Sequence, residues 1–144
     1  MKGLPILAAL FASAVLLGAA AAGPAEVEYF DHEKVAKGGS LVTADDYRVS
    51  MNRRDATGQV EVHEKETDIF YVTEGEATFV TGGTVIGGTR SFSQPYQVLG
   101  KEIQGGETHH LTKGDVIVIP AGTPHWFKQV PQSIQYFVVK SIKP

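Results

Sequence analysis

The sequence contains no cysteine. This absence excludes disulfide bonds, thiolate metal sites, cysteine nucleophiles and the acylated cysteine of a lipoprotein. Any metal site must therefore use nitrogen and oxygen ligands. The sequence also lacks a surplus of basic residues, since the formal net charge is −3 and the isoelectric point is near 5.9. Nucleic-acid-binding proteins usually present a basic face, so no nucleic-acid partner is expected.

Long patterns of helical period are missing after residue 23, and short apolar runs separated by turns take their place. Only one short helical turn is expected, over residues 32–37. In the first expected strand, Tyr47, Val49 and Met51 share one face. Strands are expected over residues 47–51, 59–63, 69–72, 77–81, 116–119 and 135–139, with a turn at 74–76. Many short strands with Gly and Pro turns predict an all-β sandwich or barrel.

The one long apolar run lies at the N-terminus. Lys2 is followed by an uncharged segment over residues 3–24 that is rich in Ala and Leu and has four alanines at 19–22. A positive start, an apolar middle and a small-residue end predict a secretory signal peptide over residues 1–22. The alternative is a retained membrane anchor, because the run is just long enough to span a bilayer. The signal peptide predicts an exported protein, periplasmic or extracellular, with a single domain over residues 23–144 and no membrane contact after cleavage.

Residues 114–127 form the most informative segment. Gly114 and Asp115 make a tight turn into an apolar strand. A Pro-Ala-Gly-Thr-Pro sequence then ends that strand sharply and restarts the chain, so that His125 opens the next strand. The pattern therefore presents one imidazole at a defined position.

A second group of polar residues precedes it. Glu61 and His63 lie two residues apart on an expected strand, so their side chains point to the same face. Asp68 shares its strand face with Phe70 and is expected to point into the same interior. Imidazoles and carboxylates that converge inside a barrel suit Mn, Fe, Ni, Co or Zn, and two of each favour Mn(II) or Fe(II).

Both segments resemble the conserved motifs of the cupin superfamily. The second motif is matched by the spacing of Gly114, Pro120, Gly122 and His125. The first motif is matched with substitutions over residues 61–75, where Glu61 stands in place of the first His and Asp68 in place of the usual Glu. The resemblance implies a cupin jelly-roll barrel, that is, a double-stranded β-helix. It also implies a divalent transition metal, with Glu61, His63, Asp68 and His125 as ligands.

Three alternatives stay open at the metal site. Glu61 is either a ligand or a solvated strand residue. Glu66 competes with Asp68, because the shorter aspartate side chain has less reach. The third alternative is that the protein has the cupin fold but has lost the ability to bind metal.

Further residues are candidates for substrate binding and proton transfer. His109 and His110 are adjacent on an expected strand, so only one of them can face the interior of the barrel. His110 is the candidate general base, and the alternative is that it is a structural histidine. Arg54 next to Asp55 is interpreted as a surface turn pair. The candidate substrate pocket comprises Arg53, Trp126, Phe127 and Tyr136.

Residues 87–106 are polar and rich in turn residues. Such a segment predicts a lid or an entrance over one mouth of the barrel. The alternative is a β-hairpin that lengthens the sheet or forms the edge of a homodimer.

The resemblance implies a metal-dependent enzyme acting on a small carboxylate, phenolic or sugar-type molecule, as an oxidoreductase, lyase or isomerase. The alternative is a non-catalytic module that binds a small ligand, with or without metal. A structural role in a homodimer formed by sheet faces is a third hypothesis. Fold alone does not choose among these functions.

Overall fold

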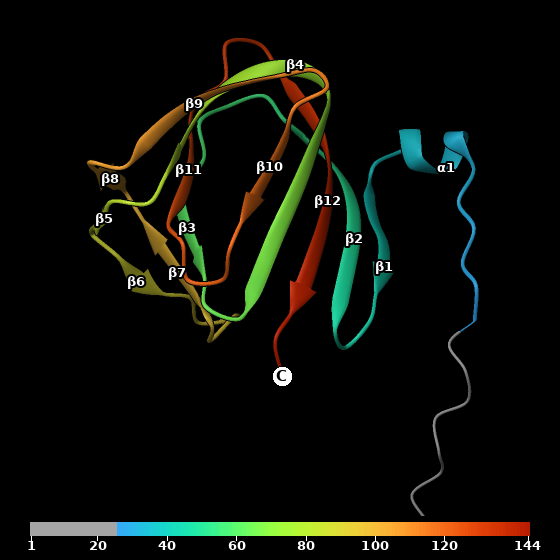
Figure 1. Cartoon of the computed structure of the whole chain (residues 1–144), viewed down its shortest axis with the longest axis horizontal. Coiled ribbons are helices and arrows are strands. Elements are labelled where there is room, and N and C mark those ends of the chain that lie inside the picture. The colour runs from blue at the N-terminus through green and yellow to red at the C-terminus, as the bar shows by residue number, and fades with distance from the viewer. Residues whose placement is uncertain (1–25) are drawn as a thin grey trace, which may run out of the picture.

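The computed structural model describes residues 26–144 (Figure 1). The predicted signal peptide over residues 1–22 lies outside the described residues. Within residues 26–144, no helix has the length and apolar character needed to cross a membrane.

One short helix, α1 (His32–Ala36), precedes the strands at the position where a helical turn was predicted. Asp31 caps it, since its side chain accepts a hydrogen bond from the Lys34 backbone N–H at 2.8 Å. The strands in chain order are β1 (Gly39–Thr43), β2 (Tyr47–Arg54), β3 (Val60–His63), β4 (Glu66–Thr81), β5 (Thr84–Ile86), β6 (Thr89–Arg90), β7 (Gln97–Gly100), β8 (Glu102–Gln104), β9 (Glu107–Thr112), β10 (Val116–Ile119), β11 (His125–Gln129) and β12 (Ile134–Ile142).

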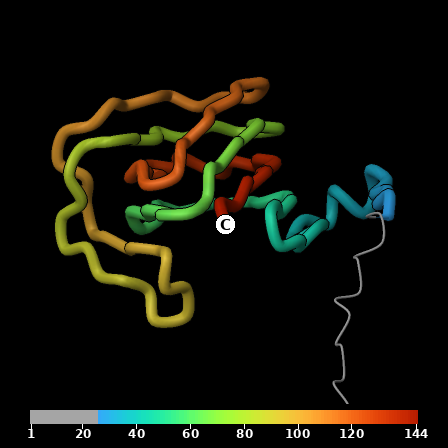
Figure 2. The backbone as a smooth tube through the Cα atoms, turned by 60° about the horizontal axis from the view of Figure 1, so that its bottom comes forward, coloured from blue at the N-terminus to red at the C-terminus, as the bar shows by residue number. Residues whose placement is uncertain are grey.

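The strands form an antiparallel jelly-roll barrel, which confirms the predicted all-β cupin fold. Strands β1, β2, β12, β4 and β10 make one side of the barrel, and β9, β11, β3, β7 and β6 make the other. The long strand β4 joins the two sides: its first part pairs with β10 and β12, and its later part pairs with β9 and β11. Figure 2 shows the segment from β5 to β8 on one flank of the barrel, opposite β1 and α1.

The predicted turn at residues 74–76 is wrong, because β4 runs through it without interruption. Gly75 lies in that strand with φ +77°, in the left-handed region that disfavours other residues. A Cβ atom at this position would also collide with the carbonyl oxygen of Ser133. The glycine therefore bends one strand from the first side of the barrel to the second, where the sequence pattern indicated a break between two strands.

Residues 87–106 form strands and not a separate lid, but the predicted entrance agrees with Gln94 and Gln97, which line a cavity together with Glu61 and His63. The segment contains β6, β7 and β8, and β7 pairs with β3 over four residues. The alternative prediction, a β-hairpin that lengthens the sheet, is therefore correct. Residues 91–96 connect the two strands of this hairpin, β6 and β7. This pairing supports the strand that carries Glu61 and His63.

Aromatic rings fill the middle of the barrel. Phe79 is fully buried, and its ring centroid lies 4.6 Å from that of Phe127 in an edge-to-face arrangement. Phe70 and Tyr136 complete the group, with centroids 5.0 Å apart. Buried aliphatic side chains surround these rings: Val72, Ala77, Leu111, Ile119, Ile134 and Val138. The core therefore occupies one part of the barrel interior and leaves the rest to polar side chains.

Candidate metal and ligand site

Three strands bring the polar side chains together. In the register of β3 and β11, Glu61 lies opposite His125, so their side chains share one face. The turn before β11 is held in place because the Gly122 N–H donates to the His63 carbonyl at 2.8 Å. Gly122 has φ +84°, which explains the glycine in the Pro-Ala-Gly-Thr-Pro sequence. The turn thus fixes His125 against the strand that carries the other histidine.

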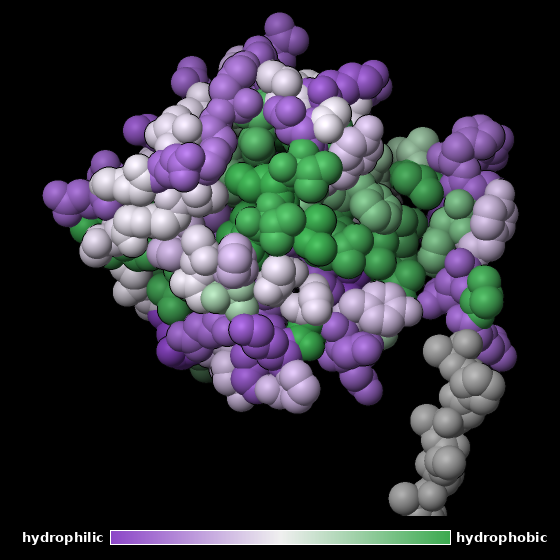
Figure 3. Space-filling model, in the orientation of Figure 1, coloured by the Kyte–Doolittle hydropathy of each residue, from purple (hydrophilic) through white to green (hydrophobic). Residues whose placement is uncertain are grey.

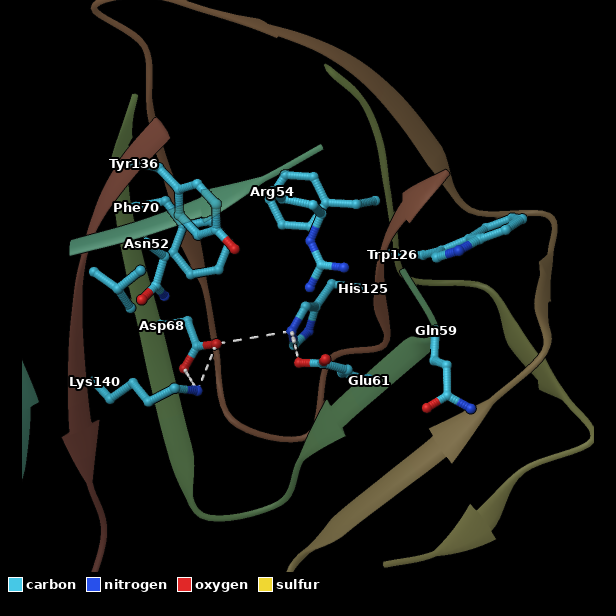
Figure 4. A pocket seen from close by; sticks show the side chains of 12 residues that line it. Asn52, Arg54, Gln59, Glu61, Asp68, Phe70, His125, Trp126, Tyr136 and Lys140 are labelled. Atoms are coloured by element: carbon cyan, nitrogen blue, oxygen red, sulfur yellow. Dashed lines mark hydrogen bonds and ion pairs between the residues drawn. The ribbon is translucent and has the colours of Figure 1, made fainter. Parts of the chain in front are cut away.

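The four predicted ligands converge inside the barrel. Figure 4 shows three of them, Glu61, Asp68 and His125. Glu61 Oε2 lies 3.3 Å from His63 Nε2 and 4.0 Å from His125 Nε2. Asp68 Oδ2 lies 3.6 Å from His63 Nε2 and 3.7 Å from His125 Nε2. The two imidazoles and Asp68 are buried, whereas the Glu61 side chain is partly exposed.

His125 is oriented for coordination through Nε2. Its Nδ1 lies 3.1 Å from the Thr123 carbonyl, which requires a proton on Nδ1 and leaves the Nε2 lone pair directed at the cluster. Burial holds the pKa of His125 below its ordinary value, so the ring is neutral at neutral pH. Burial alone would raise the pKa of Glu61, but the hydrogen bond with His63 and the neighbouring positive charges lower it overall. Glu61 is therefore a carboxylate at neutral pH.

Lys140, in β12, is a member of the cluster that the sequence analysis missed. Its Nζ donates to both oxygens of Asp68, at 2.8 and 2.9 Å, and lies 3.0 Å from Glu66 Oε2. The interior positions of β12 follow a period of two from Ile134, and this period would have pointed to Lys140. The lysine supplies the positive charge that a buried aspartate needs.

Glu66, the alternative to Asp68, approaches the other side of His63. Its Oε2 lies 3.9 Å from His63 Nδ1, and its Oε1 accepts a hydrogen bond from Arg48 at 2.9 Å. Two ligand sets are thus available, Glu61–His63–His125 and His63–Glu66–Asp68. In the second set Lys140 contacts both carboxylates, so the first set has the freer donor atoms.

The first set fits a divalent transition metal by its donor chemistry. Two imidazoles with one carboxylate are a common ligand set for Zn and non-haem Fe. Both His Nε2 atoms face the same carboxylate oxygen, and the Nδ1 hydrogen bond of His125 is the kind of outer contact that orients metal-binding histidines.

A cavity of about 190 Å³ adjoins the cluster. Trp126, Phe127 and Tyr136 line it as the sequence predicted, and their role in substrate binding stays a prediction. The placement predicted for Arg53 is wrong, because Arg53 is exposed on the other face of β2. Arg54, interpreted as a surface residue, points into the cavity instead (Figure 4). The remaining lining residues are Asn52, Gln59, Glu61, Asp68, Phe70, His125, Val138 and Lys140.

His110 does not reach the cluster. Its side chain is 63% exposed and its Nε2 lies 3.1 Å from Glu76 Oε2. The neighbouring His109 shares the inward face of Leu111, and its Nε2 lies 2.9 Å from Thr81 Oγ1. The prediction that His110 serves as the general base at this site is therefore wrong in its placement, because the strand turns this side chain outward.

Comparison with known proteins identifies the family. The family model described as cupin matches residues 25–144. The chain belongs to the cupin family. Its histidine and carboxylate cluster is a possible metal site. Membership of the family indicates a cupin-type function, that is, binding of a small ligand or a metal.

Solved structures support the fold. A cupin domain from Schizosaccharomyces pombe is similar at 12% identity with a TM-score of 0.52, covering 74% of this chain and 60% of that one. The chain thus spans less than two thirds of that structure. A Thermus thermophilus protein is similar at 18% identity and TM-score 0.54, covering 82% of this chain and 100% of its own. A cupin superfamily protein from Desulfitobacterium hafniense has 15% identity and TM-score 0.50, with 74% and 76% covered. The search of curated proteins found no match.

Proposed function

We propose that this cupin binds a divalent transition metal through Glu61, His63 and His125 and acts on a small organic molecule held in the adjoining cavity. The observation that carries the proposal is the convergence of two buried imidazole Nε2 atoms on one carboxylate oxygen, at 3.3 and 4.0 Å. Asp68 is the candidate fourth ligand, in competition with Lys140 for its oxygens.

A bound metal of this kind supplies a Lewis acid for a substrate oxygen and, if it is iron, redox chemistry. The chain supplies the rest. Phe70, Phe127 and Tyr136 limit the access of water to one side of the cavity. Since His110 points away, proton transfer falls to the Lys140–Asp68 pair, which lines the same cavity. These groups suit an oxidoreductase, a lyase or an isomerase.

The second candidate function is a non-catalytic module that binds a small ligand without metal. Lys140 favours it, because this ammonium group already neutralises Asp68 and approaches Glu66. A cluster with its own internal cation does not need a metal ion to balance the charge of its buried carboxylate.

The proposed setting is outside the cytoplasm, with residues 1–22 removed as a signal peptide and residues 23–144 forming the mature domain. The composition of the N-terminal segment supports this. N-terminal sequencing of the protein from its natural host should begin near residue 23, and an intact Met1 in the cytoplasmic fraction would contradict export.

Elemental analysis of the purified protein tests the metal proposal. We expect one equivalent of a transition metal in the wild type and strongly reduced occupancy in both His63→Ala and His125→Ala. His110→Ala is the matched control, since its exposed imidazole lies apart from the cluster, and it should keep the metal. Absence of metal from the wild type, or unchanged occupancy in both variants, would favour the metal-free module.

A further inference from the structure

Arg54 lines the cavity with no carboxylate within ion-pair distance, although its charge contributes to the lowered pKa of Glu61. Among the ion pairs of residues 26–144, Arg48 pairs with Glu66, and Lys140 pairs with Glu66 and Asp68, but none includes Arg54. Its Nε is buried and has no hydrogen-bond partner. A guanidinium without a carboxylate inside a cavity leaves a fork of strong donors to be satisfied.

The surroundings of Arg54 hold its guanidinium over the cavity. Cζ lies 5.0 Å from the centroid of the Phe127 ring, in a cation–π contact. Stacking of one guanidinium face on a ring leaves the N–H groups at its edge free to donate. Figure 4 shows the guanidinium directed toward Glu61 and His125.

Gly58 provides the space that this position requires. The φ angle of Gly58 lies outside the left-handed region, so the backbone does not require glycine there. A Cβ atom on Gly58 would, however, lie 2.7 Å from Nη1 of Arg54. The Gly58 carbonyl in turn accepts the indole N–H of Trp126 at 2.8 Å. The missing side chain thus makes room for the arginine beside a fixed wall.

We infer that Arg54 binds the carboxylate of a small organic acid, whose other end extends toward the Glu61–His63–His125 cluster. Arginine forms bidentate, charge-assisted hydrogen bonds with carboxylates. Asn52 and Gln59 offer amide groups to further substrate oxygens, and aromatic rings offer an apolar wall. A cavity of about 190 Å³ is smaller than those that hold drug-sized ligands, so the acid is a small one. The inference rests on the proposed function and selects the carboxylate from its substrate classes.

Calorimetric titration with benzoate tests the inference, with benzamide as the neutral probe of the same shape. We expect benzoate to bind more tightly than benzamide to both metal-free and metal-loaded protein. Arg54→Met should weaken benzoate binding about 10- to 100-fold, in line with the loss of charge-assisted hydrogen bonds. Arg53→Met is the matched control, because that neighbouring arginine is exposed on the other face of β2. This variant should bind benzoate with the affinity of the wild type. The fluorescence of Trp126, the only tryptophan, reports whether the ligand occupies this cavity.

A second variant keeps the test decisive if Arg54→Met does not fold. Gly58→Ala keeps the arginine but displaces its guanidinium, so it should also weaken benzoate binding while leaving benzamide unaffected. The inference is overturned if benzoate does not bind, if the variants at positions 53 and 54 behave alike, or if benzoate binding depends on metal and not on Arg54. The metal proposal fails separately: benzoate binding that needs Arg54 but persists in a protein that takes up no metal would support the inference alone.

Discussion

The two ends of the barrel interior differ in chemistry, although the same strands build both. Along β4, Phe79 at one end is fully buried among aromatic and aliphatic side chains. Asp68 at the other end is 1% exposed, yet it contacts Lys140 and two imidazoles. The two side chains are buried to nearly the same extent, but burial stabilises the fold only at the apolar end. At the polar end, burial costs free energy that paired charges must offset.

The largest effect is expected from a substitution at the apolar end. Phe79→Ala should lower the free energy of unfolding by about 3–5 kcal/mol, because it removes a fully buried ring and leaves a cavity. Urea denaturation measures the change. Phe92→Ala is the control, since Phe92 is fully exposed and its loss should have almost no effect. Similar results for both variants would contradict the described core.

At the polar end, the expected loss comes from charge. Lys140→Met should destabilise the metal-free protein by about 2–3 kcal/mol, because it leaves the buried Asp68 carboxylate without its ammonium partner. The double variant Asp68→Asn/Lys140→Met should recover most of that loss. Additive effects in this double-mutant cycle would show that the pair does not interact as described.

Trp126 packs against a separate apolar cluster and also makes one hydrogen bond. Trp126→Phe keeps much of the packing against Val60 and Val80 but leaves the Gly58 carbonyl unpaired. A loss of about 1 kcal/mol is expected in thermal or urea unfolding. A change within experimental error would mean that water replaces the indole N–H.

The smallest effect on stability is expected on the outer face of the same strands. Figure 3 shows hydrophobic side chains gathered on the face that carries β10, β4 and β12. Ile69, Tyr71, Val116 and Val118 are 37–62% exposed there. They are apolar and uncharged, so this face can meet a second copy of itself without like-charge contacts, as expected for the predicted homodimer.

Val118→Lys should change the free energy of unfolding of one subunit by at most about 0.5 kcal/mol. It should nevertheless shift the mass measured by light scattering from dimer to monomer. Ile86→Lys, at an exposed apolar residue on β5, is the control and should leave the mass unchanged. A wild-type protein that is already monomeric would contradict the homodimer.

The strand alternation of β2 shows where sequence reasoning reached its limit. Met51 shares the outward face of its cross-strand partner Phe137, whereas Asn52 and Arg54 line the cavity. The usual rule that apolar side chains point inward is reversed here because the site itself lies inside the barrel. A shift of one residue exchanges the two faces of a strand, so the sequence pattern predicts Arg53 and His110 where the structure places Arg54 and His109 on the inward face.

Sequence alone determined the all-β class, the cupin motifs and the shared strand face of Glu61 and His63, because turn residues and a period of two act over short distances. Only the tertiary structure decided that Lys140 neutralises Asp68, that β4 bends at Gly75 without ending, and that Arg54 points into the cavity beside Gly58. These features depend on contacts between residues far apart in the chain. Their energies arise from burial and charge pairing, which no local pattern of residues specifies.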